Sequence, residues 1–385
     1  MPVEALAAAT GTATMEITVS KFELLRELTA TQGVVERKTT IPILSNYLFE
    51  ASGDQLSLTA TDLDLSLRTA CSAKVKKEGA CTVPARKLHD YVKLLPDADI
   101  TIKLLENHWI SIRCGRSNTK MVGMARSNFP SLPMFPTAGV VKLPAQVLRG
   151  MIAKTGFAIA SEESRYTLNG ALMVLKPESI TMVATDGHRL SHIERSGEKF
   201  EGVSGELKTL IPKKAMDELK SLLDSTDVET IDFAKDESTL YFRIGPRLLT
   251  SRQLTGQFPN YEAVLPKDNT KSVTLPSDEL SVAISRVAQF ADERSRAVRL
   301  RLEKGELKLS ASSTETGESE DSIETNYNGE TLTVGFNAQY ILDFLKAVGA
   351  GDVKLELKDP QSAGQLRPAD SEDYKYRYIV MPMRI

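Results

Sequence analysis

Short runs in which hydrophobic and polar residues alternate recur along the whole chain, and longer stretches with helical spacing lie between them. The first alternating run, Met15–Val19, predicts a strand. Ser20 follows as a candidate N-cap, and Glu23 stands where a capping box needs its acid. The predicted helix has an apolar face made of Phe22, Leu24, Leu25 and Leu28.

This start of a helix recurs, because Ser20, Pro144 and Pro276 precede similar apolar stretches at intervals of 124 and 132 residues. A second helical stretch follows later in each repeat. Pro84 and Pro212 suit the first position of such a helix, and Asn337 suits an N-cap. The pattern predicts helices over 20–31, 83–96, 144–160, 212–224, 276–291 and 335–349.

A threonine followed by an acid closes a β-branched run in each repeat, at Thr61–Asp62, Thr185–Asp186 and Thr314–Glu315. Gly187 adds a turn signal, since glycine adopts positive φ without steric cost. The alternative is acid–base chemistry by Asp186 and His188. The other two acids lack a following histidine, which favours a structural turn capped by the acid.

The repeats define units of roughly 125 residues that read as strands, helix, strands, helix, strands. This order predicts an α+β fold in which two helices pack on antiparallel sheet. Proline-containing linkers follow Phe129–Leu132 and Phe258–Tyr261. We therefore expect a flexible extension over 1–14 and domains over 15–136, 137–266 and 267–385.

Composition places the chain among ordinary globular proteins, with 41% hydrophobic and 26% charged residues in 385. No apolar run approaches the roughly 20 residues of a membrane span, and the first residues lack a signal-peptide pattern. Cys71, Cys81 and Cys114 have no metal spacing and favour reduced thiols in the cytoplasm. A net charge of -3 argues against a chain coated in basic residues but allows a local basic surface.

Several motifs together resemble the bacterial DNA polymerase III beta subunits, the sliding clamps of replication. They are Thr40–Asn46, Thr61–Leu63, Arg165–Gly170, Thr185–Leu190, Phe258–Tyr261 and Val380–Ile385. The resemblance covers residues 15–385. It implies three repeated DNA-clamp domains per chain and a head-to-tail homodimer that forms a ring of six domains, with helices lining the hole.

The resemblance also implies a function, that of a processivity factor that encircles duplex DNA and has no catalytic activity. The implied partners are double-stranded DNA, the DNA polymerase III alpha subunit, an ATP-driven clamp loader, and other polymerases and repair factors. It implies no cofactor, no metal and no membrane, and a place in the bacterial cytosol at the nucleoid. The alternative is a peptide-binding scaffold that forms no ring, which oligomeric mass would distinguish.

By the same resemblance, partner peptides bind between the second and third domains. Leucine, valine, proline and methionine make such a cleft apolar, and flexible methionines suit many related peptides. The matching residues are Arg165, Leu168, Thr185, Gly187, His188, Arg189, Leu190, Pro259, Val264, Asn337, Tyr340, Ile379, Met381, Met383 and Arg384.

A basic lining would attract DNA phosphates without base contacts that stop sliding. The six predicted helices sum to +3 while the whole chain is -3. Candidate contacts on the helices are Lys87, Lys93, Arg149, Lys154, Lys213, Lys214 and Lys220. The resemblance adds the loop residues Arg37, Lys38, Arg165 and Tyr166, which match family positions that approach DNA. For each helical residue among them, an ordinary solvated helix face is the simpler interpretation. Where many relatives carry a second aromatic, this chain has Thr167. By the resemblance, the dimer candidates are Met121, Val122 and Phe290, and an ordinary core residue is the equal alternative for each.

Overall fold

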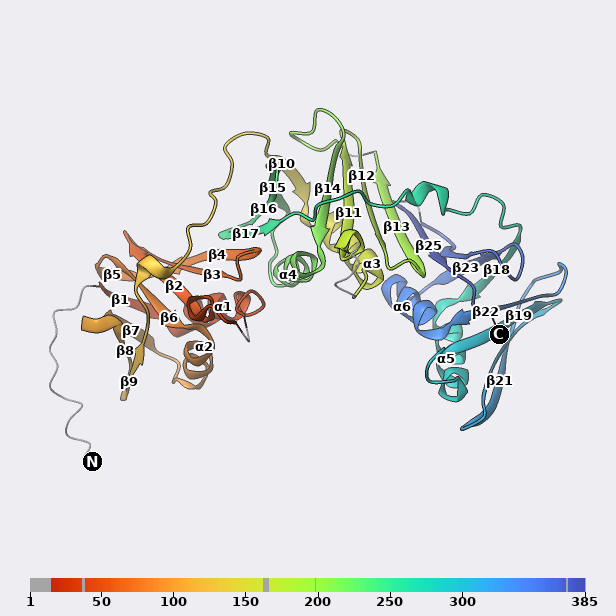
Figure 1. Cartoon of the computed structure of the whole chain (residues 1–385), viewed down its shortest axis with the longest axis horizontal. Helices are drawn as coiled ribbons and strands as arrows, with labels where there is room; N and C mark the ends of the chain where they lie inside the picture. The colour runs from red at the N-terminus through yellow and green to blue at the C-terminus, as the bar shows by residue number, and fades with distance from the viewer. Residues whose placement is uncertain (1–14, 37–38, 162–165, 198, 372, 385) are drawn as a thin grey trace. The chain divides into compact units, whose positions relative to one another are not determined.

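The computed structural model describes residues 15–36, 39–161, 166–197, 199–371 and 373–384. The predicted extension over 1–14 lies outside them. The described chain forms helices and antiparallel strands (Figure 1), so the predicted α+β class is confirmed. It divides into two compact units, Met1–Ala145 with Ser221–Arg252, and Gln146–Lys220 with Gln253–Ile385.

Unit 1 contains a five-stranded and an eight-stranded antiparallel sheet. The first has the order β5 (Lys74–Lys77), β1 (Met15–Ser20), β7 (Asp99–Leu104), β8 (Trp109–Cys114), β9 (Ser117–Val122). The second has the order β10 (Val141–Pro144), β15 (Thr230–Lys235), β16 (Thr239–Ile244), β17 (Arg247–Arg252), β4 (Leu65–Ser72), β3 (Gln55–Thr61), β2 (Asn46–Ser52), β6 (Gly79–Pro84).

Unit 2 contains an eight-stranded and a four-stranded sheet. The larger has the order β14 (Leu207–Pro212), β11 (Gly170–Lys176), β12 (Ser179–Thr185), β13 (Arg189–Ser196), β25 (Lys375–Val380), β24 (Gly364–Pro368), β23 (Asp352–Leu357), β18 (Lys271–Pro276). The smaller has the order β21 (Gly317–Glu324), β20 (Glu306–Ser313), β19 (Ala297–Glu303), β22 (Leu332–Asn337).

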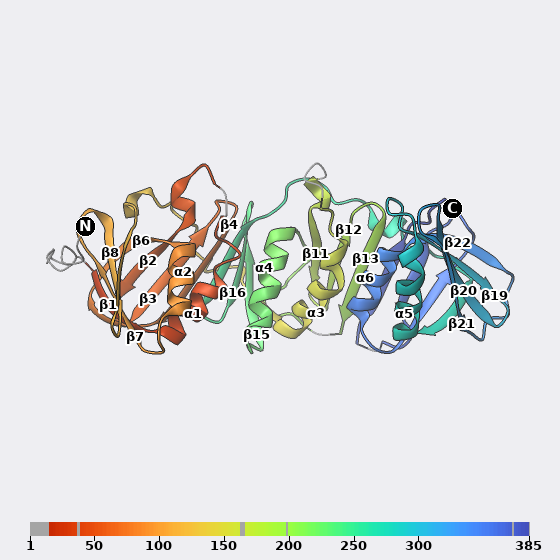
Figure 2. The ribbon, with the colours of Figure 1, turned by 90° about the horizontal axis from the view of Figure 1, so that it is seen from below.

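The six predicted helices all form, each somewhat shorter than predicted. Helices α1 and α2 lie side by side, as do α5 and α6 (Figure 2). Short 3-10 turns extend α3 and α5, at Gly156–Ala158 and Ala288–Phe290. The helices are α1 (Lys21–Ala30), α2 (Ala85–Leu94), α3 (Ala145–Thr155), α4 (Lys213–Asp224), α5 (Ser277–Val287) and α6 (Ala338–Val348).

The predicted start of α1 was wrong in two respects. Ser20 is the N-cap residue, but its side chain makes no capping hydrogen bond, and Glu23 pairs with Arg26 at 3.1 Å instead. Phe22 is 67% exposed, whereas Leu24 is buried. At 3.6 residues per turn, positions two apart lie nearly opposite each other on a helix, so Phe22 cannot share the face of Leu24.

The prolines do not stand at first helical positions either. Pro84 ends β6 and Pro212 ends β14, each directly before a helix. Pro84 has ψ 111°, which is extended backbone, so the helix begins one residue later. The cap predicted at Asn337 is confirmed, because its side chain accepts a hydrogen bond of 2.9 Å from the Gln339 amide.

Two of the three predicted acid-capped turns form as expected. Asp186 Oδ1 accepts the His188 and Arg189 amides at 2.9 and 3.0 Å, and Gly187 has φ 89°. Asp62 Oδ1 accepts equivalent amides in the turn before β4. The third was misaligned by one residue. In that turn the Ser313 hydroxyl accepts the Glu315 amide, as the Thr185 hydroxyl accepts that of Gly187, so Thr314 occupies the position of the acid.

The two eight-stranded sheets share one strand order and register. Leu48 pairs with Thr59 and Thr82 in unit 1, and Leu172 pairs with Val183 and Leu210 in unit 2. The paired positions of strands β2, β3, β4, β6 and β17 therefore have equivalents in β11, β12, β13, β14 and β25, which allows their chemistry to be compared residue by residue.

Candidate functional site

One face of the eight-stranded sheet of unit 2 is packed against helices. Ser191 of β13 donates to the Lys154 carbonyl of α3, and the Tyr378 hydroxyl donates to the Tyr340 carbonyl of α6. Successive residues of a strand point to opposite faces. Leu190, His192 and Ile379 therefore point to the outer face, away from these helices.

That outer face is apolar. Its buried cluster is covered by the segment that follows β17, in which Leu254, Tyr261 and Leu265 are partly buried. Pro259 precedes Tyr261 in this segment and helps to hold it extended, since proline fixes φ. The buried cluster consists of Leu172, Val174, Val183, Leu190, Leu210, Phe258 and Ile379.

Where the covering segment meets the sheet, a cavity of about 140 Å³ opens to the surface. It lies beside the turn at Gly187 and the end of β25. Its walls are mostly hydrocarbon, with Arg189 the one charged residue among those that line it. The lining residues are Leu168, Thr185, Gly187, Arg189, Leu190, Pro259, Tyr261, Val264, Ile379 and Met381.

Arg189 holds several elements together below this cavity. Its side chain is only 10% exposed and pairs with Asp186 at 3.1 Å and with Asp343 of α6 at 2.5 Å. It also donates to the Phe157 carbonyl at 2.6 Å, and its guanidinium lies 4.5 Å from the centre of the Tyr340 ring. Burial by itself would lower the pKa of Arg189, but its surroundings outweigh burial and raise it, so Arg189 stays charged.

The end of the chain crosses between two elements next to the cavity. The Met381 amide donates to the His188 carbonyl at 2.9 Å, and the Met383 amide donates to the Gly335 carbonyl of β22 at 2.8 Å. Met381 is 44% exposed at the cavity wall. The tail is thus held by its backbone, which leaves a flexible thioether available to a ligand.

The cavity brings together nine of the residues predicted for a peptide pocket. Of the others, His188 and Arg384 are exposed, Asn337 caps α6, Tyr340 stacks on Arg189 and Met383 binds Gly335. Arg165 lies outside the described residues. Sequence reasoning missed Tyr261, although an aromatic residue two positions after Pro259 in an apolar linker was a usable signal. The nine are Leu168, Thr185, Gly187, Arg189, Leu190, Pro259, Val264, Ile379 and Met381.

The ring of Tyr261 packs against the imidazole of His192, with centroids 5.6 Å apart and the ring planes tilted by 34°. His192 is buried, and its Nδ1 has no hydrogen-bond partner among the described residues. Burial is the largest influence on this group and lowers its pKa. Glu194 on β13 and Glu262 on the covering segment favour the charged form, while Arg377, directly opposite on β25, disfavours it.

Acidification is expected to destabilise this part of unit 2. Because the unfolded chain binds the His192 proton more tightly, the stability that neutral His192 contributes is present above about pH 6.5 and is lost as the pH falls through the folded-state pKa. Melting temperature measured from pH 7.5 to pH 5 should fall more steeply for the wild type than for His192→Phe, which cannot titrate. Equal slopes would contradict the prediction.

Comparison with known proteins identifies the family. Residues 15–133, 142–260 and 262–384 match the N-terminal, central and C-terminal domains of the DNA polymerase III beta subunit. The chain belongs to the beta sliding clamp family. It thus has three clamp domains, each with two helices on antiparallel sheet, and is a non-catalytic processivity factor of DNA polymerase III.

Full-length relatives and solved structures agree with this membership. The beta sliding clamp of Caulobacter vibrioides is 35% identical over 377 residues, which are 96% of this chain and 100% of that one. That of Pseudomonas putida is 37% identical over 374 residues, again 96% and 100% of the two chains. A Pseudomonas aeruginosa clamp bound to griselimycin has a TM-score of 0.89 at 35% identity, covering 97% and 100%.

Membership settles the choice between turn and catalysis at Asp186. Members of the clamp family are non-catalytic, and one oxygen of the Asp186 carboxylate already accepts two backbone amides. Among the described residues no group of three or more histidines, cysteines and acids could hold a metal ion. Within the same residues, no helix is long and apolar enough to cross a membrane.

The residues predicted to contact DNA differ in how they are presented. Lys87 and Lys93 on α2 and Lys214 on α4 are exposed, and Tyr166 is 75% exposed. Lys154 instead lies over the Tyr374 ring at 5.1 Å, and burial lowers its pKa. Arg149, Lys213 and Lys220 are half-buried, and Arg37, Lys38 and Arg165 lie outside the described residues.

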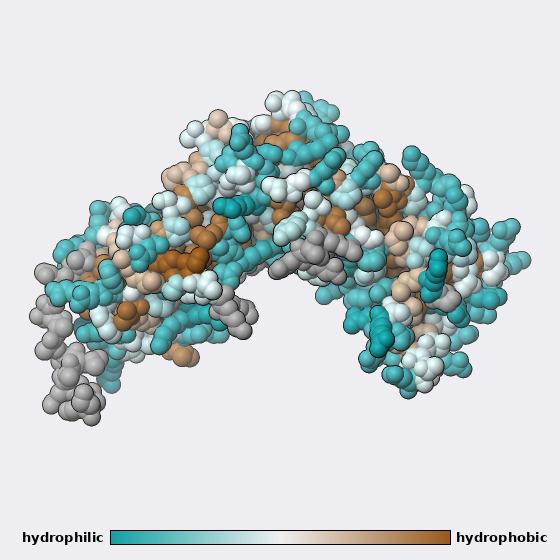
Figure 3. Space-filling view, viewed as in Figure 1, coloured by the Kyte–Doolittle hydropathy of each residue, from teal (hydrophilic) through white to brown (hydrophobic). Residues whose placement is uncertain are grey.

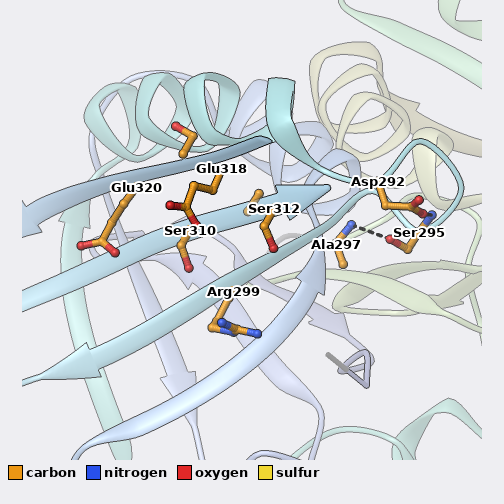
Figure 4. Close-up of a pocket in the computed structure, with 10 residues that line it drawn as sticks. Asp292, Ser295, Ala297, Arg299, Ser310, Ser312, Glu318 and Glu320 are labelled. Carbon is orange, nitrogen blue, oxygen red and sulfur yellow. Dashed lines mark hydrogen bonds between the residues drawn. The ribbon is translucent and has the colours of Figure 1, made fainter. Parts of the chain in front are cut away.

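The residues predicted for the dimer lie near sheet edges. Met121 and Val122 end the edge strand β9, with Met121 buried and Val122 51% exposed, and Phe290 is half-buried after α5. The four-stranded sheet has β21 at one edge and β22 at the other. Glu318 and Glu320 of β21 line a cavity of about 560 Å³ together with Arg299 (Figure 4).

Proposed function

We propose that two copies of this chain close head to tail into a ring around duplex DNA and that the cavity of unit 2 tethers partner proteins by short apolar peptides. The observation that supports peptide binding is the apolar floor of the cavity. Ligand-binding sites are typically hydrocarbon surfaces of this kind with few polar groups. The fifteen residues predicted for the peptide pocket are proposed as its contacts.

Comparison of the two eight-stranded sheets supports this choice of site. Thr59, Ser66, Thr82 and Thr250 occupy in unit 1 the places that Val183, Leu190, Leu210 and Ile379 occupy in unit 2. Four buried hydroxyl-bearing side chains thus replace four buried hydrocarbon ones. Although the backbone is the same, these four positions of the unit 1 sheet are polar. The buried apolar cluster on that face is formed by Ile43, Leu44, Leu48 and Phe129 instead.

The partners we propose for the pocket are the DNA polymerase III alpha subunit, the clamp loader, and other polymerases and repair factors. Solved relatives offer support from their ligands. Clamps of Pseudomonas aeruginosa and Bartonella birtlesii have been solved bound to griselimycin. A Caulobacter crescentus clamp holds polyethylene glycol at a region proposed for beta-motif tethering.

For the ring, we propose contact between the edge strands β9 and β21. Arg113, Arg116 and Lys120 lie on or beside β9, whereas β21 carries Glu318, Glu320, Asp321 and Glu324. Opposite charges on two unpaired edges favour their association and fix its register. A head-to-tail contact of this kind closes if the rotation between copies allows it.

The single tryptophan should report this contact. Trp109 pairs with Val122 across β8 and β9 and is 42% exposed, so a partner strand on β9 would reduce its exposure to water. On dilution from 10 µM towards 1 nM we expect its emission to shift to the red as dimers part. Lys120→Glu should move that transition to higher concentration by about tenfold, most clearly at low salt. A spectrum independent of concentration would refute the contact.

The ring itself is tested by retention on DNA. After loading by the clamp loader and ATP, protein should stay on nicked circular plasmid during gel filtration and leave once the plasmid is linearised. Equal loss from both, with the loader present, would favour the scaffold without a ring.

Three further proposals follow from the family resemblance. We propose that the eleven residues predicted for DNA contact face the duplex. We also propose that the domains span 15–136, 137–266 and 267–385, and that the protein acts at the nucleoid in the bacterial cytosol.

A further inference from the structure

Arg68 occupies in unit 1 the position that His192 occupies in unit 2, directly opposite Thr59 and Leu248 on the neighbouring strands. The next residue, Thr69, donates its hydroxyl to Glu27 of α1, so Thr69 points to the helices. Because successive residues of a strand point to opposite faces, Arg68 points to the outer face of the sheet.

The hydrogen-bonding capacity of Arg68 is largely unused. One terminal nitrogen contacts the Met134 sulfur at 3.5 Å, which is a weak acceptor. Its Nε is buried without a partner among the described residues, and none of their carboxylates lies within ion-pair distance. Thr59 beside it is 1% exposed, and its hydroxyl is also buried without a partner there. Two adjacent buried polar groups without protein partners are costly, so a ligand that offers them hydrogen bonds would be favoured at this position.

The charges around Arg68 favour an anion as that ligand. Nearby cations of unit 1 already have acids, since Arg252 lies 3.5 Å from Asp64 and Arg126 lies 2.6 Å from Glu50. Arg243, two strands away, has Asp232 at 3.8 Å and the Phe135 ring at 3.7 Å. Arg68 is therefore an uncompensated cation, and the side chain that touches it, Met134, is 72% exposed and free to move aside.

We propose that Arg68 and Thr59 form a binding site for a carboxylate, supplied by an acidic side chain of a partner protein that docks on the outer face of this sheet. The Nε and a terminal nitrogen of a guanidinium match the two oxygens of a carboxylate. The Thr59 hydroxyl can donate to the same group. The exposed Met134 gives the neighbouring residue of the partner an apolar contact. This site is independent of the apolar pocket of unit 2 and differs from it in ligand chemistry.

Spectroscopy of the full-length chain tests the site directly. With ¹⁵N-arginine labelling, the Nε–H signal of Arg68, assigned from its absence in Arg68→Lys, should shift saturably with the tripeptide acetyl-Leu-Glu-Leu-amide. The neutral tripeptide acetyl-Leu-Gln-Leu-amide should cause no such shift. Equal shifts with both would overturn the proposal. The proposal would also be overturned if the Arg68 Nε–H signal shifted with neither peptide and showed contact only with a bound water, because the site would then be structural.

Variants identify the groups responsible. Binding of fluorescein-labelled Leu-Glu-Leu should weaken at least tenfold in Arg68→Met and severalfold in Thr59→Val. The matched control is Arg252→Met, which removes the same charge from the same sheet and should change the dissociation constant less than twofold. An equal loss of affinity in Arg252→Met would mean that the peptide responds to the overall charge of the sheet and does not bind Arg68 specifically. A larger Arg68 shift with a duplex oligonucleotide than with the peptide would assign the site to phosphate instead and overturn the protein partner. If Arg68→Met fails to fold, the titration of the labelled wild type with the acidic and the neutral tripeptide still tests the carboxylate site.

Discussion

Replacing Leu190 by serine is expected to abolish peptide binding at the pocket of unit 2 while the chain still folds. Leu190 is buried at the floor of the cavity, and serine is the residue that the equivalent position, Ser66, carries in unit 1. The change removes hydrocarbon contact and adds a hydroxyl that an apolar peptide cannot satisfy, together worth about 3 kcal/mol. A loss of affinity on the order of 100-fold follows.

The measurement is fluorescence anisotropy with a labelled clamp-binding peptide of the DNA polymerase III alpha subunit, the partner proposed above. Val174→Thr is the matched control, because Val174 belongs to the same buried cluster but does not line the cavity. It should bind within threefold of the wild type. Melting curves establish that both variants fold. If Leu190→Ser binds as tightly as the control, the peptide does not use this floor.

Replacing Arg247 by methionine is expected to cost unit 1 about 3–5 kcal/mol, because it leaves a buried acid poorly compensated. Glu27 of α1 is completely buried, and Arg247 of β17 binds both of its oxygens, at 3.0 and 3.2 Å. Arg26 and Thr69 contact the same carboxylate but cannot replace that paired geometry. The free energy of unfolding by urea should fall accordingly.

Two controls separate charge burial from general damage. Arg252→Met breaks an exposed ion pair with Asp64 and should cost less than about 1 kcal/mol. Glu27→Leu combined with Arg247→Met removes both charges and should recover most of the loss. If the double variant is no more stable than Arg247→Met, an unpaired Glu27 is not the cause.

The same pair gives unit 1 an acid-sensitive element. Burial alone would raise the pKa of Glu27, but hydrogen bonds from Arg247, Thr69 and Arg26 outweigh burial and lower it. A lowered carboxyl pKa contributes stability that is present above the unfolded-state value of about 4.3 and is lost as the pH falls through the folded-state pKa. Arg247→Met should therefore show a weaker acid dependence than the wild type.

Local sequence patterns were enough to predict the secondary-structure elements and to recognise the family. Helices α1 to α6 follow from apolar spacing, and the cap at Asn337 and the turn at Asp186 follow from side chains that bond amides two or three residues away. The predictions were wrong where a second residue could make the same interaction or where a side chain had an alternative partner. The side chain of Glu23 bonds Arg26 rather than the end of α1. The third turn was misaligned because Ser313 and Thr314 offer the same hydroxyl.

By itself the sequence determined the threefold repeat, the fold class and membership of the clamp family, because each depends on periodicity and motifs that lie close together in the chain. The family resemblance named nine residues of the cavity, but only the tertiary structure showed that they share one apolar floor and that the equivalent positions of the other sheet are polar. That floor joins β13 to β25, whose paired residues Leu190 and Ile379 are far apart in sequence, and places Tyr261 over His192. The environment of a side chain on a sheet depends on neighbours from distant strands, so Arg68 and Thr59 show their unused hydrogen-bonding groups only once those strands are paired.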